Sequence, residues 1–99
     1  MPKYVVSRTA QFDMRGIARY TVEKWGTDQA VRYATGLRSC FEMLGDNPRI
    51  GRTCDSIKEG LRRYECAKHV IFYRQQPGGI RVVRVLHQGM IPTRSRFDE

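Results

Sequence analysis

Two histidines and a group of arginines in the second half of the chain are the side chains best suited to chemistry. His69 and His87 could move a proton near neutral pH, while Arg62 and Arg63 could stabilise the charge of a phosphate. On neighbouring strands these side chains could converge into a ribonuclease-like site. The alternative is that both histidines lie at the ends of strands and pack there, which for His87 is at least as well supported because an apolar pair precedes it.

The cysteines and glycines indicate little further chemistry. No catalytic signature surrounds Cys54 or Cys66, and the spacing of cysteines and histidines matches no common zinc motif. Gly78 and Gly79 follow a proline in a turn, so they are not a phosphate-binding loop between a strand and a helix. With Cys40 as the third cysteine, we expect reduced, buried thiols in a cytoplasmic protein. We expect no metal, no cofactor and no small-molecule substrate.

The chain is strongly basic. Lysine and arginine number 18 against 10 aspartates and glutamates, which gives a net charge of +8. Residues 1–47 carry +2 of this charge and residues 48–99 carry +6. A positive field favours an acidic partner, either nucleic acid or an acidic protein segment, although basic side chains also keep small domains soluble.

Length and hydropathy limit the architecture to one globular domain over residues 1–99, of which 40% are hydrophobic. No apolar run approaches the ~20 residues needed to span a bilayer. Residues 1–6 contain no secretory signal. We therefore expect no contact with a membrane.

Hydrophobic periodicity in the first half predicts a short strand at residues 4–6 and two helices. Ser7 or Thr9 can cap the first helix, and Gly26 ends it. Its apolar stripe consists of Ala10, Met14, Ile17, Thr21 and Trp25. Thr27 or Asp28 can cap the second helix, whose stripe consists of Ala30, Tyr33, Ala34, Leu37, Phe41 and Leu44.

The link between the two helices is so short that they must form an antiparallel hairpin. Gly45 and the pair Asn47-Pro48 end the second helix. We expect Trp25, Phe41 and Leu44 to be core residues of this hairpin.

The second half predicts a long loop and then a three-stranded antiparallel meander. Residues 48–60 lack a sustained period, with one helical turn expected at 56–59. The strands are expected at residues 61–66, 69–73 and 80–86, joined by short turns. The polar tail, about residues 90–99, can be partly disordered.

This order of elements predicts an α+β fold, with the helical hairpin packed on one face of a small antiparallel sheet. We expect no element to cover the other face. That face or its rim would carry the candidates for binding a target or another protein partner, which are Arg62, Arg63, Arg74, Arg81, Arg84 and His87.

Three strand phrases together resemble the ParE toxins of bacterial toxin–antitoxin modules. They are Gly-Leu-Arg-Arg at 60–63, His-Val-Ile-Phe-Tyr-Arg at 69–74 and Arg-Val-Leu-His-Gln-Gly-Met at 84–90. The helical hairpin and the phrase Asn-Pro-Arg-Ile-Gly at 47–51 agree, so the resemblance covers nearly the whole chain, about residues 4–92.

The resemblance implies the RelE/ParE fold and a toxin that acts on DNA gyrase and stalls replication. It implies a ParD-type antitoxin, whose acidic C-terminal part wraps the toxin and which alone contacts the operator DNA of the shared operon. It implies no catalytic residues. A net charge of +8 suits the attraction of an acidic, disordered chain that folds on binding.

The enzymatic alternative is a RelE-type, ribosome-dependent mRNA endoribonuclease. That branch of the fold typically uses basic side chains on the sheet and a tyrosine near the C-terminus. No tyrosine follows Tyr73 here, and Phe97, the only aromatic residue of the tail, cannot transfer a proton. His69 begins a strand where ribonucleases often carry arginine. A plain nucleic-acid-binding module is disfavoured because aromatic residues do not alternate with the basic ones.

Overall fold

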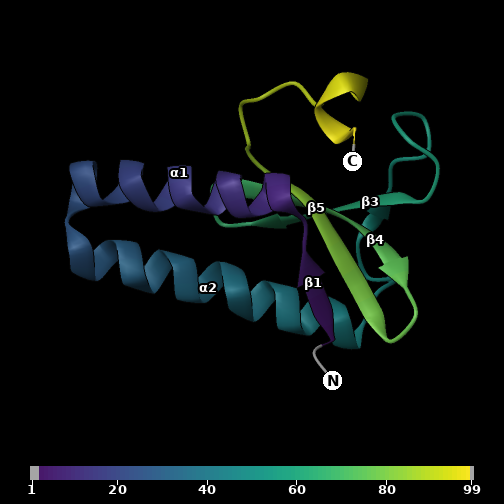
Figure 1. The fold of residues 1–99 in the computed structure, drawn as a ribbon, viewed down its shortest axis with the longest axis horizontal. Helices are drawn as coiled ribbons and strands as arrows, with labels where there is room; N and C mark the ends of the chain where they lie inside the picture. The colour runs from purple at the N-terminus through teal and green to yellow at the C-terminus, as the bar shows by residue number, and fades with distance from the viewer. Residues whose placement is uncertain (1–2, 99) are drawn as a thin grey trace.

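The computed structural model describes residues 3–98, and its elements follow the predicted order. Strand β1 (Tyr4–Val6) leads into helices α1 (Arg8–Trp25) and α2 (Thr27–Asp46). After α2 come β2 (Arg52–Thr53), β3 (Leu61–Cys66), β4 (His69–Gln76), β5 (Gly79–His87) and the 3-10 helix η1 (Arg94–Phe97). Figure 1 shows the helices as a hairpin beside the sheet, which confirms the α+β class.

The five strands form one sheet in the order β1-β5-β4-β3-β2. The meander of β3, β4 and β5 is antiparallel as predicted, whereas β1 pairs in parallel with β5 and makes the sheet mixed. The register of β4 and β5 shifts between Phe72 and Tyr73, which leaves Val83 as an extra residue on β5. The short strand β2, within the predicted long loop, pairs with β3.

Ser7 joins the start of α1 to the sheet. Its side-chain oxygen accepts a hydrogen bond from the Ala10 N–H at 3.0 Å, which is the expected N-cap, and donates to the Val83 carbonyl at 2.8 Å. The Ser7 N–H donates to the Val82 carbonyl at 2.9 Å. The pairing of β1 with β5 ends at Val82. The hydrogen bond from the Ser7 hydroxyl to the Val83 carbonyl therefore pairs the edge of β5 one residue further.

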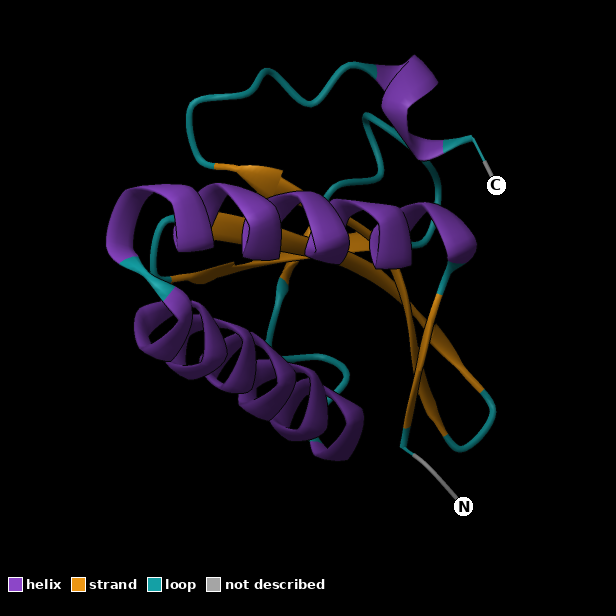
Figure 2. Cartoon of the chain, turned by 60° about the vertical axis from the view of Figure 1, so that its left-hand side comes forward, coloured by secondary structure: helices purple, strands orange, loops and turns teal. Residues whose placement is uncertain are grey.

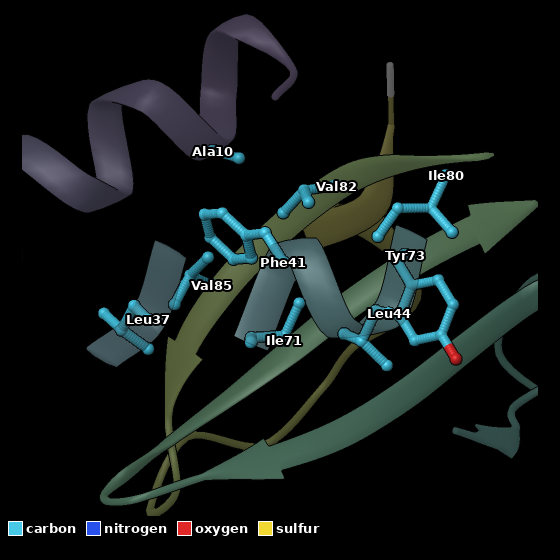
Figure 3. Close-up of a cluster of buried hydrophobic side chains, with 9 residues drawn as sticks. All are labelled: Ala10, Leu37, Phe41, Leu44, Ile71, Tyr73, Ile80, Val82 and Val85. Carbon is cyan, nitrogen blue, oxygen red and sulfur yellow. The ribbon is translucent and has the colours of Figure 1, made fainter. Parts of the chain in front are cut away.

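The main core lies between the helical hairpin and the sheet. Phe41, Leu44 and Leu37 of α2 are buried there as the sequence predicts, together with side chains from β4 and β5. Figure 3 shows these residues converging on one another, with Ala10 of α1 above them. The Tyr73 hydroxyl donates to the Pro48 carbonyl at 2.8 Å and accepts from the Gly51 N–H at 2.9 Å, which anchors the loop after α2.

The opposite face of the sheet is not open, which corrects the prediction that no element covers it. A second apolar cluster lies there, made of Cys54, Leu61, Val70, Phe72, Val83, Leu86 and Phe97. The Phe97 ring is fully buried and lies 4.7 Å from the Phe72 ring, and the Phe97 carbonyl accepts a hydrogen bond from Lys58 Nζ at 2.8 Å. In Figures 1 and 2, η1 lies beside the loop between β2 and β3.

The tail and the long loop therefore differ from the sequence-based expectation. Residues 94–97 are helical rather than disordered, because an aromatic side chain anchors them to the sheet. Residue 99, the end of the predicted tail, lies outside the described residues. Residues 56–59 form turns and bends instead of the expected helical turn. The Leu61 N–H donates to the Lys58 carbonyl, and the Gly60 N–H donates to the Asp55 side chain.

The prediction that Trp25 is a core residue is wrong. Its side chain is 67% exposed, because the connected ends of α1 and α2 extend beyond the strands (Figure 1). No helix among residues 3–98 has both the length and the apolar character needed to cross a membrane.

Candidate functional site

The neighbouring arginines Arg62 and Arg63 point to opposite faces of the sheet, as successive residues of a strand must. Arg62 donates to the carbonyls of Arg49 and Gly51 at 3.2 and 2.7 Å, so it holds the loop before β2. The Arg63 guanidinium lies 5.3 Å from the centre of the Phe72 ring on the other face, and its Nε is buried without a hydrogen-bond partner. The structure does not bring these two side chains together.

Arg74 and Arg81 do lie together. They are direct cross-strand partners on β4 and β5. Each follows a residue of the main core, Tyr73 and Ile80, so both side chains leave the sheet on the face away from the helices. This pair is the part of the predicted basic surface that the tertiary structure assembles.

Arg84 is a structural clamp between three segments. Its Nε and Nη2 donate to the two carboxylate oxygens of Asp13 on α1 at 2.8 Å each, and its Nη1 donates to the Arg96 carbonyl of the tail at 3.0 Å. The two side chains of this ion pair are only 17% and 9% exposed. Donation of these hydrogen bonds to Asp13 raises the pKa of Arg84 above its ordinary value. Asp13 also accepts the Val85 N–H at 3.0 Å.

The two histidines meet at the far end of β4 and β5. His69 and His87 are cross-strand partners, with ring centres 5.5 Å apart. The Tyr33 hydroxyl lies 2.6 Å from His69 Nδ1, and it accepts the Lys68 N–H at 3.1 Å. Burial, together with the neighbouring His87, lowers the pKa of His69 to about 4, and burial raises the pKa of Tyr33. His69 is therefore neutral at pH 7.

The ribonuclease-like constellation considered from the sequence is not assembled. Cys66, not Arg63, is the residue of β3 opposite His69, and Arg63 lies three residues along the strand, about 10 Å away. Arg63 also faces the second apolar cluster, whereas His69 contacts α2. No group of three or more metal-ligating side chains occurs among residues 3–98.

A groove of about 700 Å³ lies between α1, the tip of the helical hairpin and the end of β5. Its walls include three aromatic residues of α1 that are mostly exposed, Phe12, Tyr20 and Trp25. Gly16 lies between the first two, and a Cβ atom added there would meet nothing within 4 Å. The missing side chain therefore leaves room in the groove.

The two ends of the groove differ in polarity. The α1 side is mostly apolar, with Asp13 of the Arg84 ion pair as its one charged residue, and Met90 extends it from the segment after β5. The opposite end is basic through Lys68 and also carries the rings of His87 and the neutral His69. An amphipathic helix or strand with an acidic rim fits such a groove, because its apolar face would cover the aromatic residues while carboxylates reach the basic end.

Of the six residues predicted to bind a partner, Arg84 and His87 line this groove, and the other four do not. The aromatic wall was not predicted. Phe12, Gly16 and Tyr20 recur at intervals of four residues, so they form a second stripe of α1 beside the predicted core stripe.

Known proteins are similar to this chain over most of its length. Residues 4–92 match the family described as ParE toxin of type II toxin-antitoxin system, parDE. Toxin ParE1 of Mycobacterium tuberculosis is 43% identical over 89% of this chain and 91% of that protein. Toxin ParE1 of Caulobacter vibrioides is 39% identical over 91% and 93%, and Toxin ParE of Escherichia coli is 31% identical over 91% and 88%.

A solved structure shares the fold. It is described as the chromosomal ParDE TA system from P. aeruginosa, and it superposes with a TM-score of 0.74 at 18% identity. The match covers 85% of this chain and 92% of that one.

Proposed function

Because the chain belongs to the ParE toxin family of type II toxin–antitoxin systems, we propose that it inhibits DNA gyrase and stalls replication until a ParD-type antitoxin binds it. This action would take place in the cytoplasm, where gyrase works on DNA. Contact with operator DNA would be made by the antitoxin.

We propose that the antitoxin binds in the groove beside α1. Phe12, Tyr20 and Trp25 are 68%, 58% and 67% exposed, and an isolated protein would leave this aromatic area in contact with water. Contiguous exposed apolar patches of this kind mark protein-binding sites. A net charge of +8 and the basic end of the groove select an acidic, amphipathic segment as the occupant.

Inhibition by binding, rather than by cleavage of RNA, agrees with the arrangement of the polar groups. His69 is engaged by Tyr33 and stays neutral, and Arg62 is bound to loop carbonyls. The tail aromatic Phe97 is buried and has no hydroxyl group. We propose Arg74 and Arg81, which share one face of the sheet, as contacts for the target.

A paired assay tests the function. Purified toxin is added to gyrase with relaxed plasmid, and separately to translating ribosomes with mRNA. We expect loss of supercoiling or accumulation of cleaved DNA in the gyrase assay, with mRNA left intact. Codon-specific mRNA cleavage with gyrase unaffected would establish the endoribonuclease instead.

A glycine pair tests the groove. A Cβ at Gly16 meets nothing within 4 Å, so Gly16→Leu places a side chain in the groove, and we expect it to weaken antitoxin binding by at least about tenfold while leaving the fold intact. Gly36→Leu on α2 is the matched control, because a side chain there also meets nothing within 4 Å but lies outside the groove. Equal antitoxin affinity for the two variants would place the antitoxin elsewhere.

A further inference from the structure

Cys40 and Cys66 lie where α2 rests on the end of β3. Cys66 is the last residue of β3, opposite His69, and its thiol points at the Gly36 carbonyl of α2 at 3.9 Å. Cys40 is one helical turn beyond Gly36, on the same side of α2. In an α-helix the Gly36 carbonyl accepts the Cys40 N–H, so the Cys66 thiol contacts the turn of α2 that carries Cys40. Both residues are half-buried and pack against the main core.

The third cysteine cannot take part in this contact. Cys54 belongs to the second apolar cluster, on the opposite face of the sheet, and its thiol points at the Arg52 carbonyl at 3.8 Å. The chain therefore contains one pair of adjacent thiols and one separated thiol, which serves as an internal control.

We propose that Cys40 and Cys66 form an oxidisable dithiol, which a peroxide converts into a disulfide that fixes α2 to the end of β3. This inference goes beyond the proposed toxin function and does not depend on it.

The chemistry runs in two balanced steps. Hydrogen peroxide oxidises one thiol to a sulfenic acid and releases one water. The second thiol then attacks the sulfenic sulfur, forming the S–S bond and releasing a second water. Burial and the nearby Cys40 raise the pKa of Cys66, so the reactive thiolate is scarce and we expect slow oxidation. Either thiol of the pair can take the first step, and the other then completes the bond. Partial exposure of both residues lets a small peroxide reach them.

The bond would reinforce an existing contact between α2 and the sheet. Tyr33, two turns before Cys40 on α2, already contacts Lys68 in the turn after β3 and His69 at the start of β4. A cross-link between residues 40 and 66 would close a loop that contains the end of α2, β2 and most of β3. Closing a loop of this length restricts the unfolded chain, and we expect the melting temperature to rise by roughly 10 °C.

Peptide mapping of the oxidised full-length chain provides the direct test. The purified protein is treated with hydrogen peroxide, alkylated and digested without reductant. We expect a monomer lighter by two hydrogen atoms, a cross-linked peptide joining Cys40 to Cys66, and recovery of the original mass and melting temperature with dithiothreitol. A cross-link to Cys54, or oxidation to sulfinic acid without any cross-link, would overturn the proposal.

Serine variants supply the controls. Cys54→Ser should form the disulfide as the parent does, whereas Cys40→Ser and Cys66→Ser should not. Each of these two variants should instead retain a sulfenic acid at its remaining thiol of the pair, which a dimedone probe labels. A disulfide that forms as readily in Cys40→Ser or Cys66→Ser as in the parent would contradict the proposal.

Discussion

Replacing Asp13 by alanine removes the acceptor of three hydrogen bonds, two from Arg84 and one from the Val85 N–H. The Arg84 guanidinium would then remain buried with only the Arg96 carbonyl as a partner in the described structure. Leaving one charge of a buried ion pair without its partner typically costs about 3–5 kcal/mol. Since a domain of this size has a total stability of about 5–15 kcal/mol, Asp13→Ala should remove a large fraction of it.

The exposed pair Arg52–Glu65 provides the matched control. Its N···O distance of 2.6 Å is shorter than the 2.8 Å of Arg84–Asp13, but its side chains are 72% and 62% exposed. Water and salt screen an exposed pair, so Glu65→Ala should cost no more than about 1 kcal/mol. The comparison thus separates the effect of burial from the effect of distance.

Urea denaturation with linear extrapolation measures both free energies of unfolding. A double-mutant cycle with Arg84→Met isolates the coupling between Asp13 and Arg84, which we expect to exceed about 1 kcal/mol. The double variant should be less destabilised than the sum of the two single variants, because it leaves no buried charge. Similar losses for Asp13→Ala and Glu65→Ala, or a coupling near zero, would refute the assignment of Arg84 as a buried clamp.

Three further outcomes are expected. Stability should fall as the pH is lowered from about 6.5 towards 4, since His69 binds its proton more readily in the unfolded chain, and His69→Gln should weaken this dependence in urea titrations at several pH values. Phe41→Ala should lower the free energy of unfolding by about 3–5 kcal/mol, whereas Trp25→Ala should change it by less than about 1 kcal/mol and weaken antitoxin binding. A large fall in melting temperature for Trp25→Ala would show that Trp25 is a core residue after all. The antitoxin on-rate should fall steeply with added salt in stopped-flow measurements, because charges are screened beyond ~8 Å at physiological ionic strength, and an unchanged rate would remove the steering role of the net charge.

The spacing of apolar residues predicted the helices and strands well, because this spacing indicates which face of a segment can be buried. The stripe of α2 named Leu37, Phe41 and Leu44 as core residues, and all three are buried. The same method failed at Trp25. Its position continues the α1 stripe, but no part of the sheet lies beneath the end of the hairpin. Periodicity identifies a stripe, whereas its burial depends on how far the neighbouring element extends.

The arginines show the same limit for polar residues. Sequence analysis grouped them as one basic surface because their charge and strand positions were known. Strand alternation then separates Arg62 from Arg63, and a carboxylate 71 residues away along the chain takes Arg84 into a buried ion pair. Only Arg74 and Arg81 remain as a directly paired basic surface among the predicted residues.

By itself, the amino-acid sequence determined the order of strand, helical hairpin and meander, the excess of positive charge and the resemblance to ParE toxins. These depend on side-chain type and on spacing within a few turns of chain. The tertiary structure alone decided the parallel pairing of β1 with β5, the Phe97 anchor on the far face of the sheet and the groove beside α1. Each of these joins segments distant in sequence, and such contacts depend on which surfaces meet after the chain has collapsed, not on any local pattern.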